Sequence, residues 1–482
     1  MATTLDQARV ATASPATAGS RFYRAIWRWH FYAGLLVVPF MLMLAITGTI
    51  YLFKPQLDQL MYRELLIVEH TGGAALPATE QLAAVQAAYP GATVASFRPS
   101  DAHDHSAEVS LATADGRSLS VFVNPYTAGV LGERDADWNL QQVALKLHGE
   151  LLIGPAGDRM IELAACWAII LLLTGMILWW PRQGARVWGT LLPRLRGGRR
   201  VFWRDLHAVP GFYAVVLILF LLVSGLPWTG FWGKTFSKVA GDFPAAMWNA
   251  VPESTVLTGS LNEAGPKIVP WAAEAAPLPQ SALPGHEQHQ GGAPSAPATP
   301  QPGVPAGTPV DLDAIIALAQ SRGVVPGYTV SLPQTPAGVY TVSVFPDDPA
   351  DEATIHIDRY SGAVLADIRW SDYGWAPKAV EMGIALHEGK YFGLANQLLA
   401  LFAALMVVLL SVTGVIMWWK RRPDGRLGAP AAPQVLPRKK TVAGVTLLLG
   451  VLFPLVGVSL IAVGLLDWLV IRRIPRLRQV FA

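Results

Sequence analysis

Two histidines occupy equivalent positions in a motif that occurs twice in the sequence. LHGE at 147–150 precedes an apolar run that ends in Thr-Gly at 174–175 and then Trp-Trp. LHEG at 386–389 precedes a second run that ends in Thr-Gly at 413–414 and again Trp-Trp. His148 and His387 each stand twenty-seven residues before the glycine of that pair (148 to 175, 387 to 414). The matched spacing predicts two membrane helices that each carry one histidine at the same end.

Two further histidines repeat in the same way. His30 aligns with His207, and a glycine follows each by four residues, at Gly34 and Gly211. The pairs Thr47-Gly48 and Ser224-Gly225 follow at plus seventeen and plus eighteen. The repeated unit is therefore a helix with a histidine at its inner end, an outside domain, and a helix with a histidine at its outer end.

These residue types favour a haem protein. A neutral imidazole ligates iron, and two imidazoles on facing helices give a six-coordinate haem suited to electron transfer. Ionisable side chains are uncommon at membrane depth and are usually functional there. We therefore expect two haem b groups, an inner one between His30 and His207 and an outer one between His148 and His387.

Small and basic residues near the histidines are the other expected parts of the cofactor sites. The glycines would leave room for the porphyrins, and basic side chains would pair with the propionates. The expected glycines are Gly34, Gly211, Gly48, Gly225, Gly175 and Gly414. The expected inner cations are Arg24, Arg28 and Arg204, and the expected outer cations are Lys146, Arg159 and Lys390.

Each of these residues also has a structural interpretation. A membrane histidine is often a hydrogen-bonding group between helices, and small residues often let helices approach closely. The tryptophans near the helix ends suit interfacial belts. The pairs His103/His105 and His286/His289 are either metal ligands outside the membrane or surface loop, because two histidines make an incomplete site.

Composition indicates a membrane protein with large extramembrane parts. The chain has 482 residues, is 52% apolar and has a mean hydropathy of +0.36. A net charge of +3 gives no sign of nucleic-acid binding. The single cysteine, Cys166, excludes an internal disulfide and a cysteine-based iron–sulfur site within the chain.

Apolar stretches and basic segments predict five spans and their orientation. Arginine and lysine cluster at 21–28, 182–204 and 420–440, which the positive-inside rule places in the cytoplasm. We favour one crossing for 442–470, with a re-entrant hairpin broken at Pro454 as the alternative. The expected division is a disordered 1–20, a span at 21–53, an outside domain at 54–137, an outer helix and span at 138–182, a basic loop at 183–205, a span at 206–227, a second outside domain at 228–380 with a Pro-rich insert at 276–309, an outer helix and span at 381–420, a loop at 421–441, and a last span with its tail at 442–482.

The outside domains are predicted to be two copies of one small α+β module. In the first, 78–89 is expected to form a helix and 108–112 and 118–123 to form strands. In the second, 312–321 is expected to form a helix and 328–332, 339–345 and 353–357 to form strands. Similar turns, at 124–129 and 358–362, close both copies.

On these motifs the chain resembles the PepSY-associated transmembrane family, over nearly all of 21–475. Within that family it resembles bacterial inner-membrane iron-regulated proteins and ferric-siderophore reductases. The resemblance implies a membrane α-helical bundle with two PepSY-like periplasmic domains, and two haems with His30, His207, His148 and His387 as iron ligands. The long insert and the lack of a fused nucleotide-binding domain depart from it.

The first functional hypothesis is a haem-dependent reductase of the inner membrane. Electrons from a cytoplasmic or quinol donor would reach a periplasmic acceptor, most plausibly ferric iron held by a siderophore. Reduction favours release, because hard oxygen chelators hold the softer Fe(II) less well. The alternative is a membrane-tethered binding or regulatory protein acting on a periplasmic peptidase. A transporter is disfavoured by the lack of midplane carboxylates and interrupted helix pairs.

Overall fold

The chain divides into two compact units. The computed structural model describes residues 18–69, 72–181, 187–242, 251–252, 254–262, 267–282, 308–430 and 439–481. Unit 1 comprises 1–42, 162–222 and 406–482, and unit 2 comprises 43–161 and 223–405. Most of the expected disordered sequence lies outside the described residues, at 1–17 and 283–307. The prediction is wrong for 18–20, which begin a helix, and for 276–282, where Ala276 is fully buried and Ser281 N donates to Ala337 O (2.9 Å).

Five helices are long and apolar enough to cross a membrane. They are α1 (Ala18–Leu52), α6 (Pro155–Trp179), α7 (Arg199–Gly225), α12 (Leu394–Arg421) and α14 (Pro454–Leu466) with the π-helical turn η6 (Asp467–Ile471). At 1.5 Å per residue, the first four exceed a hydrocarbon core of roughly 30 Å. The five spans expected from hydropathy are thus present, although the last one differs in form.

The last apolar segment is a helical hairpin in unit 1 rather than one helix over 442–470. Helix α13 (Lys439–Leu452) ends before Pro454, which starts α14 and has no N–H to continue the previous helix. The two helices meet closely, because a Cβ on Gly457 would lie 2.9 Å from the Gly450 carbonyl oxygen. One unbroken helix over 442–470 is therefore wrong, and the break at Pro454 that the alternative expected is present, although Pro454–Ile471 alone is long and apolar enough for a span.

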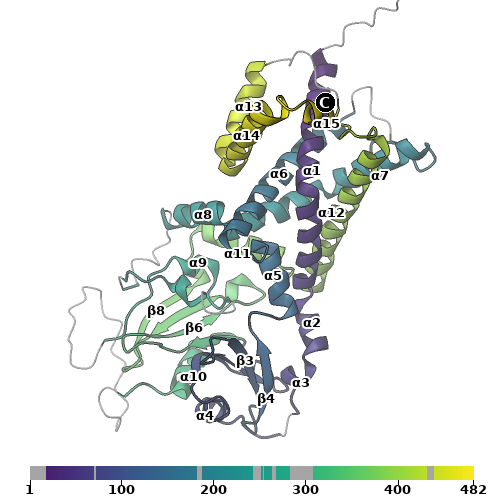
Figure 1. Ribbon diagram of the computed structural model, residues 1–482. Coiled ribbons are helices and arrows are strands. Elements are labelled where there is room, and N and C mark those ends of the chain that lie inside the picture. The colour runs from purple at the N-terminus through teal and green to yellow at the C-terminus, as the bar shows by residue number, and fades with distance from the viewer. Residues whose placement is uncertain are drawn as a thin grey trace, which may run out of the picture. The chain divides into compact units, whose positions relative to one another are not determined.

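Both flanks of this hairpin lie at the same end of unit 1. Leu427 N donates to Val480 O (2.9 Å), joining the segment before α13 to the terminal helix α15 (Pro475–Phe481). On α1, Arg28 Nη1 donates to Pro430 O (2.7 Å) and Tyr32 Oη donates to Phe481 O (3.2 Å). The basic tail thus returns to the end of α1 that carries Arg28, and Figure 1 shows α15 beside α1.

We expect reporters fused before Arg21 and after Ala482 to lie on the same side of the membrane. Paired alkaline phosphatase and green fluorescent protein fusions at each end measure this directly. A fusion after Leu452, within the hairpin, serves as the control for a disrupted segment. Opposite signals from the two termini would contradict the hairpin.

The strands of unit 2 form one antiparallel sheet of eight strands, in the order β4-β3-β2-β1-β5-β6-β7-β8. The strands are β1 (Thr93–Arg98), β2 (Ala107–Ala112), β3 (Ser118–Val123), β4 (Val130–Asp135), β5 (Thr329–Ser331), β6 (Tyr340–Val344), β7 (Ala353–Ile357) and β8 (Val364–Arg369). Each half of the chain supplies four consecutive strands, and β1 pairs with β5. The two α+β halves are therefore not separate domains, because this pairing merges them.

One hydrophobic core lies under both halves of the sheet. Helices α4 (Ala78–Ala88) and α10 (Leu312–Ser321) contribute Val85 and Ile315 to the same buried cluster as the strands. The Asp313 carboxylate of α10 accepts from the backbone N–H groups of Ala78 (2.6 Å) and Thr79 (3.2 Å) at the start of α4. This carboxylate ties the two helices together where an α-helix leaves N–H groups unsatisfied.

Short elements connect the sheet to the long helices. They are α2 (Lys54–Met61), α3 (Arg63–Leu66), α5 (Leu140–Glu150), α8 (Gly230–Asp242), α9 (Trp271–Glu274), α11 (Trp375–His387) and the 3-10 turns η1 (Leu226–Trp228), η3 (Thr258–Asn262), η4 (Pro349–Asp351) and η5 (Trp370–Asp372). Gly154 and Gly393, six residues after His148 and His387, both have a left-handed backbone (φ +62° and +54°). The turn that breaks the chain between these histidines and α6 or α12 is thus also repeated.

Candidate functional site

His30 and His207 face each other inside unit 1. Their ring centres lie 6.5 Å apart and their planes are perpendicular (89°). His30 comes from α1, where its Nδ1 lies 2.9 Å from Thr174 Oγ1 of α6. His207 comes from α7, where its Nδ1 lies 3.0 Å from Thr413 Oγ1 of α12. Each imidazole is therefore held through Nδ1 by the next long apolar helix in the chain, α6 for His30 and α12 for His207.

The threonine hydroxyls fix which ring nitrogen carries the proton. Thr174 Oγ1 donates its one proton to Ile170 O (2.9 Å), and Thr413 Oγ1 donates to Leu409 O (2.6 Å). Each hydroxyl oxygen can then only accept from the histidine, so Nδ1 carries the hydrogen. This leaves a lone pair on Nε2 of both His30 and His207, as metal ligation by that atom requires.

The second pair, His148 and His387, lies in unit 2. His148 is on α5 and His387 ends α11, so neither is on the long apolar helix that follows it, and the predicted position on those helices is wrong. The two imidazoles are close enough to interact electrostatically. His148 Nδ1 lies 3.0 Å from Thr47 Oγ1, and His387 Nδ1 lies 2.9 Å from Ser224 Oγ.

Thr47 orients the His148 ring in the same way as Thr174 and Thr413 orient the rings of His30 and His207. Its hydroxyl donates to Met43 O (2.8 Å), so its oxygen accepts from His148 Nδ1. The same contact therefore recurs four times, in two units. In every case the partner hydroxyl belongs to the residue directly before a glycine.

Those four glycines make room for the imidazole rings. A Cβ would lie 3.1 Å from His148 Cε1 at Gly48 and 3.3 Å from His30 Cε1 at Gly175. The same distance is 3.5 Å to His387 at Gly225 and 3.6 Å to His207 at Gly414. The hydroxyl thus binds Nδ1 of the histidine, and the adjacent glycine leaves space for Cε1.

A large cavity of about 1310 Å³ surrounds His30 and His207 within unit 1. All four helices α1, α6, α7 and α12 line it, mostly with apolar and aromatic side chains. Gly34 and Gly211 lie in its wall and instead face leucines, with Leu410 Cδ2 3.2 Å from a Cβ built on Gly211. Near one end Trp179 and Phe212 stack with ring centres 4.0 Å apart.

The basic residues around this cavity are only partly the expected ones. Arg204 lines it and forms an ion pair with the buried Asp205. Arg28 does not line it and instead binds the carbonyls of Pro430 and Phe481. Four further cations do line it, and the sequence motifs gave no sign of their role: Arg199, Arg200, Lys420 and Arg421.

The expected outer cations have protein partners in unit 2. Lys146 Nζ lies 2.9 Å from Asp137, Arg159 Nη1 lies 3.1 Å from Asp158, and Lys390 Nζ lies 2.7 Å from Glu388. The structure therefore gives each of them an ion-pairing role. Propionate binding by these three residues stays a prediction.

The extramembrane histidines form no metal site among the described residues. His105 Nδ1 lies 2.6 Å from Asp101 Oδ1, and the His103 carbonyl accepts from Tyr126 Oη (2.7 Å). Within the part of the chain that the structure describes, no group of three or more His, Cys, Asp or Glu side chains could hold a metal ion. His286 and His289 lie outside that part.

The fold and the paired histidines define a membrane protein with an internally duplicated helix pair. The chain belongs to the family described as the PepSY-associated TM region, whose model matches residues 27–421. This match confirms the resemblance drawn from the repeated motifs. A search of curated proteins found no match to this chain.

Proposed function

We propose that this protein is a di-haem electron-transfer protein of the bacterial inner membrane. It would carry electrons to a periplasmic acceptor, ferric iron bound by a siderophore. The observation that carries the proposal is the pair His30 and His207, with facing rings 6.5 Å apart and a lone pair on each Nε2. The family match supports the membrane setting alone.

The spacing of these rings fits one metal between them. A metal–imidazole bond of roughly 2 Å, plus about 1.1 Å from ring nitrogen to ring centre, separates two such rings by about 6.2 Å. The distance in unit 1 is 6.5 Å. A cavity of about 1310 Å³ also exceeds the usual 300–1,000 Å³ of a small-molecule site, so the pair has space for a macrocycle around it.

Different side chains would have different roles in such a site. A bound haem b would supply one-electron chemistry. His30 and His207 would bind its iron through Nε2, and Thr174 and Thr413 would hold the rings in orientation. The apolar and aromatic lining excludes water. Arg199, Arg200, Arg204, Lys420 and Arg421 would bind carboxylates at the cavity wall.

The second pair repeats this arrangement in unit 2. His148 and His387 each have a hydroxyl partner at Nδ1 and a glycine beside Cε1, as the histidines of the first pair do. We infer a periplasmic location for this pair from the positive-inside rule, because Arg- and Lys-rich segments directly precede His30 and His207 in the sequence. An electron entering from a cytoplasmic donor or a membrane quinol would thus leave through the half of the protein that carries the sheet.

An optical spectrum of the purified protein tests the proposal. We expect a haem spectrum that sharpens on reduction with dithionite, and a pyridine haemochrome content of two haems per chain. The cells must be supplied with a haem precursor. A colourless protein that instead retains a peptidase would refute the proposal and favour the membrane-tethered regulator.

A further inference from the structure

Three buried oxygen-bearing side chains meet beneath the sheet of unit 2, and the proposed function does not use them. Glu352 follows η4 and is 1% exposed, Glu381 is on α11 and is fully buried, and Tyr373 follows η5 and is 3% exposed. The three are close enough to interact with one another. They come from segments that have no motif in the sequence, so only the fold brings them together.

Most of their polar atoms lack a hydrogen-bond partner among the described residues. Both carboxyl oxygens of Glu352, Glu381 Oε2 and the Tyr373 hydroxyl lack a partner of standard hydrogen-bond geometry, although Tyr373 and Glu381 lie close enough to Glu352 for weak hydrogen bonds within the cluster. Only Glu381 Oε1 is bonded, by the backbone N–H of Ala272 at 2.7 Å. Two ionised carboxylates so placed would be costly, because burial disfavours charge that is not paired. One proton on the pair lowers this cost, because a single negative charge then remains.

The charged groups around the pair do not neutralise it. Lys390 and Lys267 favour the ionised forms of Glu352 and Glu381, but each already binds a carboxylate of its own, Glu388 and Glu274. Asp372 adds a further negative charge beside Tyr373. Burial, with the charge of Glu381, raises the pKa of Glu352 well above its ordinary value of 4.5, and burial likewise raises the pKa of Glu381.

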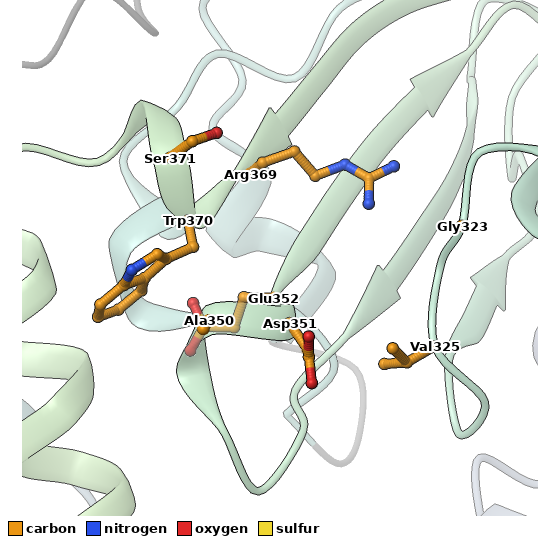
Figure 2. A pocket seen from close by; sticks show the side chains of 8 residues that line it. All are labelled: Gly323, Val325, Ala350, Asp351, Glu352, Arg369, Trp370 and Ser371. Carbon is orange, nitrogen blue, oxygen red and sulfur yellow. The ribbon is translucent and has the colours of Figure 1, made fainter.

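A pocket open to solvent reaches Glu352, one member of the pair. It encloses about 230 Å³, and its wall includes Glu352, Asp351, Arg369 and Trp370. We call it the Trp370 pocket. Figure 2 shows Asp351 and Glu352 pointing to opposite sides of their segment, with the Glu352 carboxyl on the side of the Trp370 indole. Glu352 thus both lines the pocket and interacts with the fully buried Glu381.

Helix α11 connects the same pair to a proposed iron ligand. Glu381 and His387 both belong to α11, six residues apart. At 1.5 Å per residue, they are separated by about 9 Å along the helix axis. A charge added at the His387 end is therefore felt by carboxyls that are shielded from water.

We propose that Glu352 and Glu381 are a proton-loading site for the electron-transfer centre that contains His387, with the Trp370 pocket as its route to solvent. This rests on the proposed function. The oxidised protein already holds one proton on the carboxyl pair, and when one electron arrives from the quinol or cytoplasmic donor, a second proton from solvent binds the pair. When the electron passes to the ferric chelate, that proton returns to solvent. Charge in the buried region is then unchanged over the cycle.

The two binding events affect each other equally, because coupling between sites is reciprocal. An added electron raises the proton affinity of the pair, so a bound proton must favour the electron. Raising the pH removes the proton and makes reduction harder. The midpoint potential of this centre therefore falls as pH rises, by at most about 59 mV for each tenfold fall in proton concentration.

Redox titrations of the purified full chain at several pH values test this coupling. The His30→Ala background isolates the centre of His148 and His387. There we expect a potential that falls with pH, and a flattened dependence in Glu352→Gln and in Glu381→Gln. Glu80→Gln, an exposed carboxyl of α4, is the matched control and should keep the dependence. A pH-independent potential, or an unchanged slope in both glutamine variants, overturns the proposal.

An infrared measurement separates this proposal from the proposed function. Haem-free protein should show the carbonyl band of a buried protonated carboxyl at neutral pH, weakened in either glutamine variant. Its absence from the wild-type chain overturns the proposal even if haem binds. A protein that lacks haem but shows the band would instead refute the proposed function and leave the protonated pair established. Matching gel-filtration profiles show that the variants fold.

Discussion

Replacing His148 or His387 by alanine is expected to lower the haem content from two per chain to one. Each substitution removes one of two imidazoles that would share an iron, while the other pair lies in a different compact unit with its own threonine partners. The remaining haem should keep its spectrum. His30→Ala and His207→Ala should have the reciprocal effect. Pyridine haemochrome analysis and reduced-minus-oxidised spectra measure both.

Two further variants make this prediction specific to ligation. His105→Ala removes an extramembrane histidine whose ring contacts Asp101, and it should leave two haems. The double variant His148→Ala/His387→Ala should resemble the single variants, because both residues serve one centre. Loss of both haems from a properly folded single variant would show that the pairing is not as described.

Enlarging Gly48 is expected to displace His148 and empty the same centre. A Cβ at Gly48 would already lie 3.1 Å from His148 Cε1, so alanine requires a small shift of the ring. Leucine cannot be accommodated without moving the imidazole away from Thr47. Changes in the groups that orient a metal-bound histidine typically weaken metal binding by about 10- to 100-fold. We expect a modest loss for Gly48→Ala and near-complete loss of one haem for Gly48→Leu.

The hairpin of unit 1 offers a matched control. Gly464 of α14 has no atom within 4 Å of a built Cβ, so Gly464→Leu adds the same side chain to an apolar helix without a collision. It should retain both haems. Haem retention on dilution, followed by absorbance, compares the three variants. Equal haem loss from Gly48→Leu and Gly464→Leu would point to general destabilisation of the helices instead.

Local elements of the sheet followed directly from the sequence. The alternation of apolar residues gave β3 and β7 at their observed limits, and amphipathic spacing gave α10. Strands β1, β4 and β8 were not predicted, and β4 has no buried residue, so it lacks the alternation of a half-buried strand. The pairing of β1 with β5 is a contact between residues more than 200 positions apart, and periodicity carries no information about it.

The last apolar segment shows a similar limit. Residues 442–470 have enough apolar side chains for one crossing, and hydropathy alone cannot distinguish a helix from two packed halves. Pro454 marked the break, but it was the approach of Gly450 to Gly457 and the contacts of Phe481 with α1 that determined the path. The hairpin also returns the basic tail to the end of α1 that carries Arg28 and Tyr32.

The sequence by itself revealed the repeated histidines, the hydroxyl–glycine pairs and the apolar spans, because repeats and apolar composition can be recognised from the order of residues alone. The tertiary structure alone decided that each hydroxyl binds Nδ1 of a histidine on another helix, and that the glycines admit the imidazole rings. It also brought Glu352, Glu381 and Tyr373 together. The reason is that hydrogen-bond direction, ring spacing and burial depend on how distant segments pack, which no local pattern records.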